Sequence, residues 1–480
     1  MIPALMILLV AVMSSMPQIL PAQQVDRSSA DTGDLITTDA EVIVIRNVRL
    51  VDGTGAPAMG AQTIVIRNGR LEHIGDSINI PPEAAVIDGS EFTALPGLVM
   101  MHEHMNYVVG VQTAELYLTQ PTSPSLYMAA GVTTLRTVGS GATYADLITK
   151  SLVDEGHWIG PDMDVSILLE GPNPSFPDLA PLALRTPADV SREIGYWAHR
   201  GATSVKAFWA LEEQQLQVAI KEAHKRGMKV AGHLCAVTAA KAADLGIDSL
   251  EHGLMSMSDF VVNKQPDICP SVALSDSWMN LDIQAPDVQR MIAKLVDGKV
   301  AVTSTLAAYA SNACPSDRPV KAAFEALTPR ARTVLQASLD ACRQESEPTE
   351  RTLKWRAILR NEMAFERAFV AAGGMLLAGS DAEERELVPG YADHWQLEMM
   401  VDAGFTPLQT IKFATSNGAS FLNRLAEIGT LEEGKRADLI LVRGRPDENI
   451  SDIRNVIVVF KNGIGYDAVK LIESAQGTIG

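Results

Sequence analysis

The sequence predicts an α/β protein in which a (β/α)8 (TIM) barrel is flanked by β-rich segments at both chain ends. Across residues 96–424, eight short apolar strand patterns alternate with amphipathic helical patterns such as that of residues 211–226. Alternating strand patterns separated by turns fill residues 41–95 and return over 425–470. Eight strand–helix units in one run are typical of a closed parallel barrel.

The composition is that of a globular protein with little attraction for polyanions. Hydrophobic residues make up 47% of the 480 residues and charged residues 20%, which excludes a disordered chain or a coiled coil. Forty basic and 58 acidic side chains leave a formal net charge of −18, which repels phosphate backbones and anionic lipid. We therefore expect a small-molecule substrate and neither nucleic acid nor a membrane as partner; the sequence leaves a homo-oligomer open.

The first 22 residues resemble a cleavable signal peptide. An uncharged apolar run from Ala4 to Met13 is too short to anchor in a bilayer, and Leu20 and Ala22 form a small-residue cleavage pattern. No Lys or Arg precedes Arg27, so the usual positive charge comes only from the amino terminus. We expect export to the periplasm or the medium, with a buried N-terminal helix as the alternative.

Residues 306–372 read as a helical insertion within the barrel segment, and residues 343–351 in it form a charge-rich solvated stretch. The chain has four cysteines and no CxxC pair. In an exported protein, sequence proximity favours disulfides Cys235–Cys269 and Cys314–Cys342, but inert buried thiols explain the residues equally well.

Polar residues fall repeatedly at the carboxyl ends of the expected barrel strands, where the functional groups of such barrels lie. His102 and His104 are two residues apart at the end of the first strand, so both side chains point the same way. His233 and His252 end the fifth and sixth strands. Asp381 follows the small residues at the end of the eighth strand, and Lys206 lies within the fourth. The expected strands are residues 98–104, 131–138, 164–171, 203–209, 229–234, 249–253, 299–305 and 375–382.

Each of these residues alone has an ordinary structural explanation. A strand histidine is often a satisfied core residue, a buried lysine is usually an ion-pair partner, and an aspartate at a strand end commonly forms a turn or caps a helix. These separate explanations do not account for four imidazoles, one acid and one amine all falling at the same mouth of the barrel. The pattern therefore predicts a metal site.

The chain resembles the amidohydrolase superfamily of metal-dependent hydrolases, in the imidazolonepropionase-related branch that includes prolidase-like and arginine-specific dipeptidases. The resemblance extends from Val42 to about Lys470. It rests on LPGLVMMHEH, GVTTLRTVG, SVKAF, the run from HKRGMKVAGHL to SLEHG, LLAGSDA, AGFTPLQTIKFATSNGASFL and IGTLEEGKRADLILV. It implies a (β/α)8 barrel beside a small composite β-sandwich formed by both chain ends, residues 41–95 and 425–470, which agrees with the β-rich patterns there.

The resemblance also implies a ligand set for two divalent metal ions. His102, His104 and Asp381 would hold one ion and His233 and His252 the other. Lys206, carboxylated by carbon dioxide, would bridge both as an anion. Imidazole and carboxylate ligands make zinc the best expectation.

Two divalent ions lower the pKa of a shared water toward neutrality. The resulting hydroxide would attack the substrate carbonyl while Asp381 takes the proton and returns it to the leaving amine. Tyr107, close after HEHMN, could donate its hydroxyl to the oxyanion or simply form a pocket wall.

Several residues just beyond strand ends could line the substrate pocket, and Arg385 would suit a substrate carboxylate. His394 and Glu398 share one helix face and read as supporting residues. After Lys206 the segment AFWALEEQQ differs from the Ser/Gly-rich loop of the dipeptidases. This difference puts specificity for a peptide substrate in doubt. The pocket candidates are Glu170, Phe208, Trp209, Glu383, Glu384 and Arg385; the expected surface or capping histidines are His73, His157, His199 and His224.

The leading hypothesis is a binuclear hydrolase of an amide or peptide-like C–N bond in a dipeptide or N-acyl amino acid. A mononuclear cyclic-amide hydrolase or deaminase related to imidazolonepropionase would not need Lys206. Lactonase, esterase or phosphotriesterase activity could use the same centre. A catalytically silent binding or scaffold protein would have little reason to retain every ligand.

Overall fold

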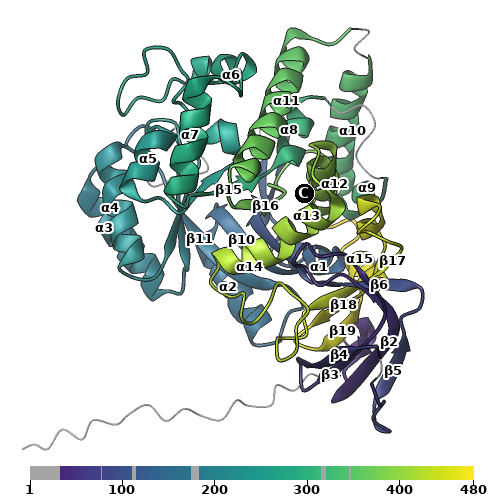
Figure 1. Cartoon of the computed structure of the whole chain (residues 1–480). Coiled ribbons are helices and arrows are strands. Elements are labelled where there is room, and N and C mark those ends of the chain that lie inside the picture. Colours follow the sequence, from purple (N-terminus) through teal and green to yellow (C-terminus); the bar gives the residue numbers. More distant parts are fainter. Residues whose placement is uncertain (1–32, 77, 111–114, 175–182, 315–320, 345–346) are drawn as a thin grey trace, which may run out of the picture.

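A computed structural model describes residues 33–76, 78–110, 115–174, 183–314, 321–344 and 347–480. In these residues a parallel barrel ringed by helices packs against a mixed sheet made from the two ends of the chain (Figure 1). The expected fold class is confirmed. The expected signal peptide, residues 1–22, lies outside the described residues.

Eight parallel strands form the barrel, in the chain order that the sequence predicts. Their residues are almost entirely buried, because helices cover the outside and side chains from alternate strands fill the inside. The first and last strands meet at their carboxyl ends, where the Asp381 N–H donates to the His102 carbonyl at 2.9 Å. The strands are β7 (Leu98–Glu103), β10 (Val132–Ser140), β11 (Asp162–Leu169), β12 (Ser204–Ala207), β13 (Lys229–Gly232), β14 (Ser249–Glu251), β15 (Ala301–Ser304) and β16 (Leu376–Ala378).

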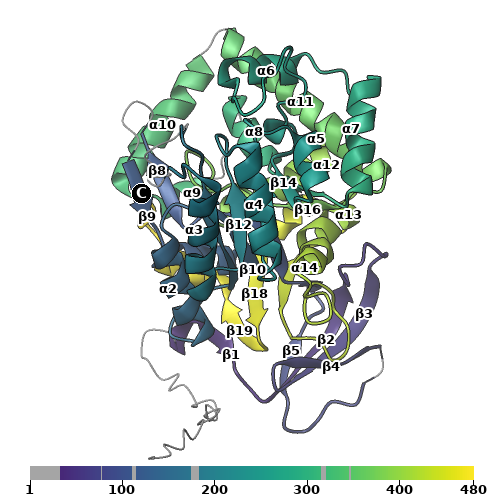
Figure 2. The same ribbon diagram turned by 90° about the vertical axis from the view of Figure 1, so that its left-hand side faces the viewer.

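Helices between the strands cover the barrel, with α3 and α4 in front of the strands in Figure 2. Thr186 caps the N-terminus of α3 in a capping box, where its side chain accepts a hydrogen bond from the Asp189 N–H. These covering helices are α1 (Ser123–Ala129), α2 (Thr143–Asp154), α3 (Pro187–His199), α4 (Glu213–His224), α5 (Ala239–Leu245), α6 (Ser271–Met279), α7 (Pro286–Asp297), α12 (Tyr391–Asp402), α13 (Pro407–Lys412) and α14 (Gly418–Phe421).

The segment expected to be a helical insertion is helical where it is described. Its helices are α8 (Leu306–Asn312), α9 (Lys321–Ala326), α10 (Pro329–Gln344) and α11 (Glu350–Ala371). The short hairpin of β8 (Asn106–Val109) and β9 (Glu115–Leu118) packs against them through Tyr107 and Val109. No helix in the described parts of the chain combines the length and the apolar character needed to cross a bilayer.

The two chain ends share one mixed sheet of nine strands in the described residues, seen in Figure 1 as purple and yellow strands side by side. β17 pairs antiparallel with both β6 and β18, which joins the C-terminal strands to the N-terminal ones. The apolar core of this terminal sheet includes Ile43, Ile64 and Phe460. The strands are β1 (Ile36–Thr38), β2 (Val42–Leu50), β3 (Met59–Arg67), β4 (Arg70–Gly75), β5 (Ala85–Asp88), β6 (Phe92–Pro96), β17 (Leu439–Arg443), β18 (Val456–Lys461) and β19 (Ile464–Asp467), followed by helix α15 (Ala468–Ser474).

All four cysteines are paired as sequence proximity favoured. Cys235 is bonded to Cys269, with Cα atoms 4.9 Å apart, and Cys314 is bonded to Cys342, with Cα atoms 5.7 Å apart. The first disulfide joins the loop after β13 to the long segment after β14, and a candidate ligand directly follows each of these two strands. The alternative of buried free thiols is therefore wrong for this structure.

Candidate metal centre

The structure brings the six residues singled out by the sequence to one mouth of the barrel. His102 and Lys206 lie in strands β7 and β12. His104, His233 and His252 directly follow β7, β13 and β14, and Asp381 lies three residues after the end of β16. Parallel strands all end at the same rim, so residues far apart in sequence meet there. The six are His102, His104, Lys206, His233, His252 and Asp381.

Asp381 is at the centre of this group. Its Oδ1 lies 3.0 Å from Nε2 of His104 and 3.2 Å from Nε2 of His102. Its Oδ2 lies 3.8 Å from Nδ1 of His252. Burial opposes ionisation of this carboxyl, but the imidazoles of His102 and His252 outweigh burial and hold its pKa well below the usual range. Asp381 is thus an anion surrounded by ring nitrogens.

His252 and His233 continue the ring of imidazoles around the mouth. The ring centroid of His252 lies 4.4 Å from that of His102 and 4.4 Å from that of His233. Burial holds the pKa of both His252 and His233 well below the ordinary value, so both rings are neutral. Each neutral ring keeps one nitrogen lone pair that can bind a metal ion. Nε2 of His233 is buried and has no hydrogen-bond partner in the described structure.

Lys206 extends its amine into the same space. Nζ lies 3.4 Å from Nε2 of His102 and donates to the Val138 carbonyl at 3.2 Å. Burial lowers the pKa of this amine, so the neutral form that reacts with electrophiles is favoured relative to an exposed lysine. Gly139 makes room for the stem, because a Cβ there would lie 2.6 Å from Cδ of Lys206.

A buried ion pair behind the mouth orients His102. Nδ1 of His102 lies 2.7 Å from Oε2 of Glu251, and Oε1 of Glu251 accepts from Nη2 of Arg136 at 2.8 Å. Burial alone would raise the pKa of Glu251, but Arg136 and then His102 outweigh it and hold the pKa at about 2. The ionised carboxylate keeps the proton of His102 on Nδ1, which leaves Nε2 as the ligand atom.

Arg136 and Glu251 were not among the residues predicted for the site from the sequence. The available signal was a charged residue inside a buried strand pattern, in TLRTV and SLEHG, because such a charge requires a buried partner. Glu383 was placed only in the pocket wall. The structure makes it a candidate ligand, because its carboxylate gathers with His104 and Asp381, with ligand atoms within 4.8 Å of one another.

The backbone at the mouth is shaped for close approach. A Cβ on Gly379 would lie 2.7 Å from the backbone nitrogen of His102, so only glycine fits between β16 and β7. His252 and Asp381 have φ of 61° and 56°, in the left-handed region that non-glycine residues rarely adopt. Such strain concentrates at functional sites, where the surrounding structure enforces it.

Tyr107 has a different partner from the one its expected role requires. Its hydroxyl donates to the carbonyl of Arg385, and its buried ring packs with Val109 and Leu335. Burial raises the pKa of this phenol. The hydroxyl is thus held by a backbone acceptor, and its role as an oxyanion donor stays a prediction.

Some of the other pocket candidates line the mouth, and others hold the surrounding loops in place. The rings of Phe208 and Trp209 lie 5.3 and 5.5 Å from that of His233, which makes them a wall of the mouth. Glu170 instead accepts from the backbone N–H groups of Gly171 and Ala210 and so fixes the loops beyond β11 and β12. Arg385 lies 3.6 Å from Glu384 and 3.4 Å from the Asn312 side chain, so it already has protein partners.

The remaining histidines lie outside this centre. Nε2 of His394 lies 2.8 Å from the Ala130 carbonyl, and burial lowers its pKa to about 4, which fits a supporting role. Glu398 pairs with Arg454 through both oxygens at 2.7 Å. The side chains of His73, His157 and His224 are 58%, 56% and 43% exposed, and His199 is exposed at the end of α3, as expected of surface residues.

The centre fits a divalent cation. Three ligand atoms from His102, His252 and Asp381 lie within 4.8 Å of one another, the imidazoles of His233 and His252 are neutral, and one buried nitrogen has no protein partner. Imidazole nitrogens and carboxylate oxygens are the ligands that zinc and related divalent ions accept. A barrel with this site at its carboxyl mouth defines a metal-dependent hydrolase.

The particular family follows from the sequence match. The model of the Amidohydrolase family matches residues 93–464, and the chain belongs to that family. It is a hydrolase of the metal-dependent amidohydrolase class. The search of curated proteins found no match.

Solved structures share the fold at low identity. A Bifidobacterium longum protein described as a prolidase is 22% identical, with a TM-score of 0.64, over 91% of this chain and 100% of its own. A Xaa-Pro dipeptidase with bound methionine is 19% identical, with a TM-score of 0.65, over 89% and 100%. A bottromycin amidohydrolase is 20% identical, with a TM-score of 0.68, over 93% of each chain.

Proposed function

We propose that this protein hydrolyses an amide or peptide-like C–N bond in a small molecule of the dipeptide or N-acyl amino acid type. The observation that carries the proposal is the convergence of four imidazoles, Lys206 and Asp381 on one buried point. Structures of the same fold include a Xaa-Pro dipeptidase with bound methionine and a prolidase complexed with N-methylphosphonate-L-proline, which supports this substrate class.

In the proposed centre the ligands divide between two zinc ions. His102, His104 and Asp381 would hold one ion and His233 and His252 the other, and Lys206, as its carbamate, would be a ligand of both. Such ions supply Lewis acidity and a water of lowered pKa. The lowered pKa of the Lys206 amine supports carbamate formation, because the neutral amine is the form that adds to carbon dioxide.

The protein's own groups would carry the proton and exclude solvent. Asp381 would take the proton of the attacking water on a carboxylate oxygen and return it to the leaving nitrogen. The ion pair of Glu251 and Arg136 would hold His102 in one tautomer throughout. Phe208 and Trp209 would close the side of the mouth next to His233.

A substrate screen combined with Asp381→Asn tests this function. Metal-reconstituted protein would be assayed against Xaa-Pro and other dipeptides, N-acyl amino acids, cyclic imides and lactones. We expect turnover of an amide substrate, reduced about 1,000-fold or more in Asp381→Asn with metal still bound. The exposed Asp297→Asn is the matched control and should be fully active. Wild-type-like turnover by the Asp381 variant would refute the role assigned to Asp381. Turnover of lactones alone would show that the protein is a lactonase and not an amide hydrolase.

A mononuclear cyclic-amide hydrolase or deaminase is the second candidate, because His102, His252 and Asp381 already form a three-ligand group without Lys206. Metal analysis of Lys206→Ala separates the two. Two ions per chain, falling toward one in the variant and partly restored by added short carboxylic acids, support the binuclear centre. One ion per chain in both proteins, with activity retained by the variant, supports the mononuclear one.

We also propose that the protein works outside the cytoplasm. Two disulfides in one chain support export, because such bonds persist in oxidising compartments. Cell fractionation, with mass spectrometry of the mature N-terminus, tests both the compartment and cleavage after Ala22.

A further inference from the structure

A pocket lies at the opposite end of the barrel from the metal centre. It has a volume of about 640 Å³ and sits where the start of β11 and the end of α2 meet the terminal sheet. Asp162, the first residue of β11, is on its floor, whereas Glu170 at the mouth follows the last residue of the same strand. The volume lies within the range of small-molecule sites.

Positive charge collects on one side of this pocket. Asp162 accepts from Nη2 of Arg424 at 2.6 Å, from Nη2 of Arg436 at 2.7 Å and from Nζ of Lys461 at 2.5 Å. Burial would raise the pKa of Asp162, but the three cations outweigh burial and lower it. Asp438, behind Arg436 and Lys461, is the second carboxylate of the cluster. Within this cluster of Arg424, Arg436, Lys461, Asp162 and Asp438, three cations face two carboxylates, so the cluster itself carries one excess positive charge.

The cluster also keeps hydrogen-bond donors that its own carboxylates do not use. Among the described residues, Arg424 donates only through Nη2, so its Nε and Nη1 have no protein acceptor. Nη1 of Arg436 likewise has no protein acceptor among the residues that the structure describes. Each of these two guanidinium groups thus keeps at least one N–H nitrogen that can donate to a carboxylate oxygen.

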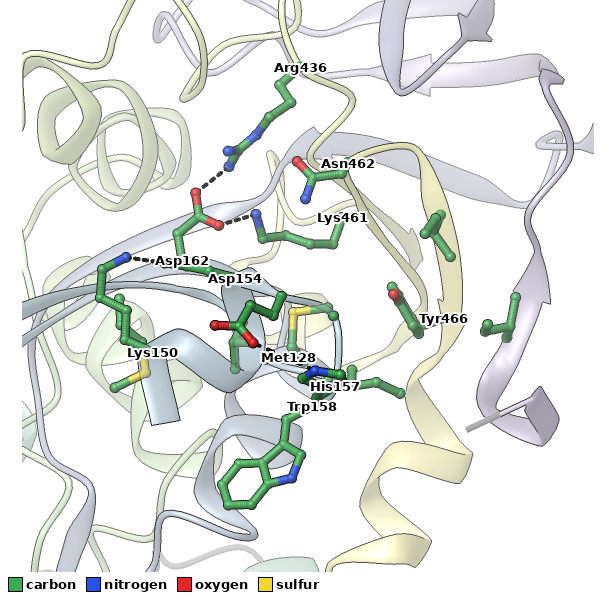
Figure 3. Close-up of a pocket in the computed structure, with 18 of the residues that line it drawn as sticks. Met128, Lys150, Asp154, His157, Trp158, Asp162, Arg436, Lys461, Asn462 and Tyr466 are labelled. Atoms are coloured by element: carbon green, nitrogen blue, oxygen red, sulfur yellow. Dashed lines mark hydrogen bonds and ion pairs between the residues drawn. The ribbon is translucent and has the colours of Figure 1, made fainter. Parts of the chain in front are cut away.

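The rest of the lining mixes apolar side chains with the polar and charged groups of residues 150–157. Figure 3 shows Arg436 and Lys461 at one end of the pocket and Trp158 at the other, with Met128 between them. At the rim, Lys150 pairs with Asp154 at 2.6 Å. The remaining rim carboxylate, Glu155, is 59% exposed, and solvent and salt screen it. The pocket thus combines a cationic end with an aromatic end.

We propose that this pocket binds a small organic anion that carries a carboxylate on an aromatic or aliphatic body. The carboxylate lies against the free N–H groups of Arg424 and Arg436, and the body packs against Trp158 and Met128. The added anion neutralises the excess charge of the cluster, and it bridges the barrel and the terminal sheet because Asp162 belongs to the first and Arg436 precedes β17 of the second.

Isothermal titration calorimetry of the full-length protein with 2-naphthoate tests the proposal. Its uncharged isostere, 2-naphthamide, is the matched control ligand. We expect one site per chain for the carboxylate and binding about 10-fold weaker or more for the amide, because the amide lacks the charge that the arginines recognise. Arg424→Gln and Trp158→Ala, which alter opposite ends of the pocket, should each weaken naphthoate binding about 10-fold.

Arg192→Gln is the control variant, because Arg192 is an exposed arginine on α3 that pairs only locally with Asp189 and Glu193. It should bind naphthoate as the wild type does. Thermal unfolding of each variant checks that the fold is retained, and Trp158→Ala leaves every ion pair of the cluster intact. Equal binding of acid and amide would overturn the proposal. So would undiminished binding in both pocket variants, or no saturable heat up to about 10 mM ligand.

Discussion

Replacing Glu251 by Gln should weaken both the fold and the metal centre, although Glu251 is not a candidate ligand. The carboxylate is fully buried between two groups that depend on it, Nη2 of Arg136 at 2.8 Å and Nδ1 of His102 at 2.7 Å. Glutamine keeps the shape and removes the charge. Arg136 would then be a buried cation without a counterion, and His102 would lose the acceptor that keeps its proton on Nδ1.

The magnitude follows from the pKa of Glu251 and from the burial of the pair. The carboxyl pKa is about 2 in the folded protein against 4.5 for an unperturbed glutamate, and this difference is worth about 3 kcal/mol of stability at neutral pH. Because the folded pKa is the lower one, this stability is present above pH 4.5 and is lost as the pH falls toward 2. Breaking a buried pair from one side costs about 3–5 kcal/mol, so we expect a loss of that size at pH 7.

Urea unfolding of metal-free protein measures the first effect, and zinc competition with a chelating dye measures the second. We expect zinc affinity to fall about 10- to 100-fold, as is typical when the carboxylate behind a ligating histidine is removed. The exposed Glu83→Gln is the control and should change neither quantity. A Glu251→Gln protein with unfolding free energy within about 0.5 kcal/mol of wild type and unchanged zinc affinity would refute the reasoning.

Two further predictions concern stability. Replacing Cys235 and Cys269 by serine should lower the unfolding free energy by about 4 kcal/mol, because their disulfide closes a loop across a sequence separation of 34 residues; an unchanged urea midpoint would contradict this. Glu366 is buried beside Glu362, and burial raises its pKa to about 8. Since the folded protein holds the proton more tightly, wild-type stability should fall by about 3 kcal/mol between pH 5.5 and 8.5. Glu366→Gln should flatten this slope in urea titrations, and an equal slope in both proteins would show that another group is responsible.

Sequence periodicity was enough to predict the barrel and the position of its site. The apolar segments ending in HEH, GH, EH and GSD mark strand ends, and parallel strands in a closed barrel all end at one rim. The convergence of His102, His233 and Asp381 therefore follows from chain order and strand direction alone. The joining of the two chain ends in one domain was expected from the family resemblance, which agreed with the β-rich patterns at both ends.

The sequence could not predict which buried charges pair inside the barrel. Arg136 is in β10 and Glu251 in β14, strands separated by three others in the sheet, so their contact depends on closure of the barrel. Nor could strand patterns show that the Tyr107 hydroxyl would meet the Arg385 carbonyl, because loop geometry decides that contact.

What the sequence by itself determined is the set of groups at the mouth, since local periodicity fixes strand ends and strand ends fix the rim. What only the tertiary structure decided is the partner of each group: the ion pair behind His102, the carboxylate of Glu383 near His104, and the pocket where Asp162 meets cations from the far end of the chain. Those pairings depend on distances across the barrel and between the barrel and the terminal sheet, and such distances exist only after the whole chain has packed.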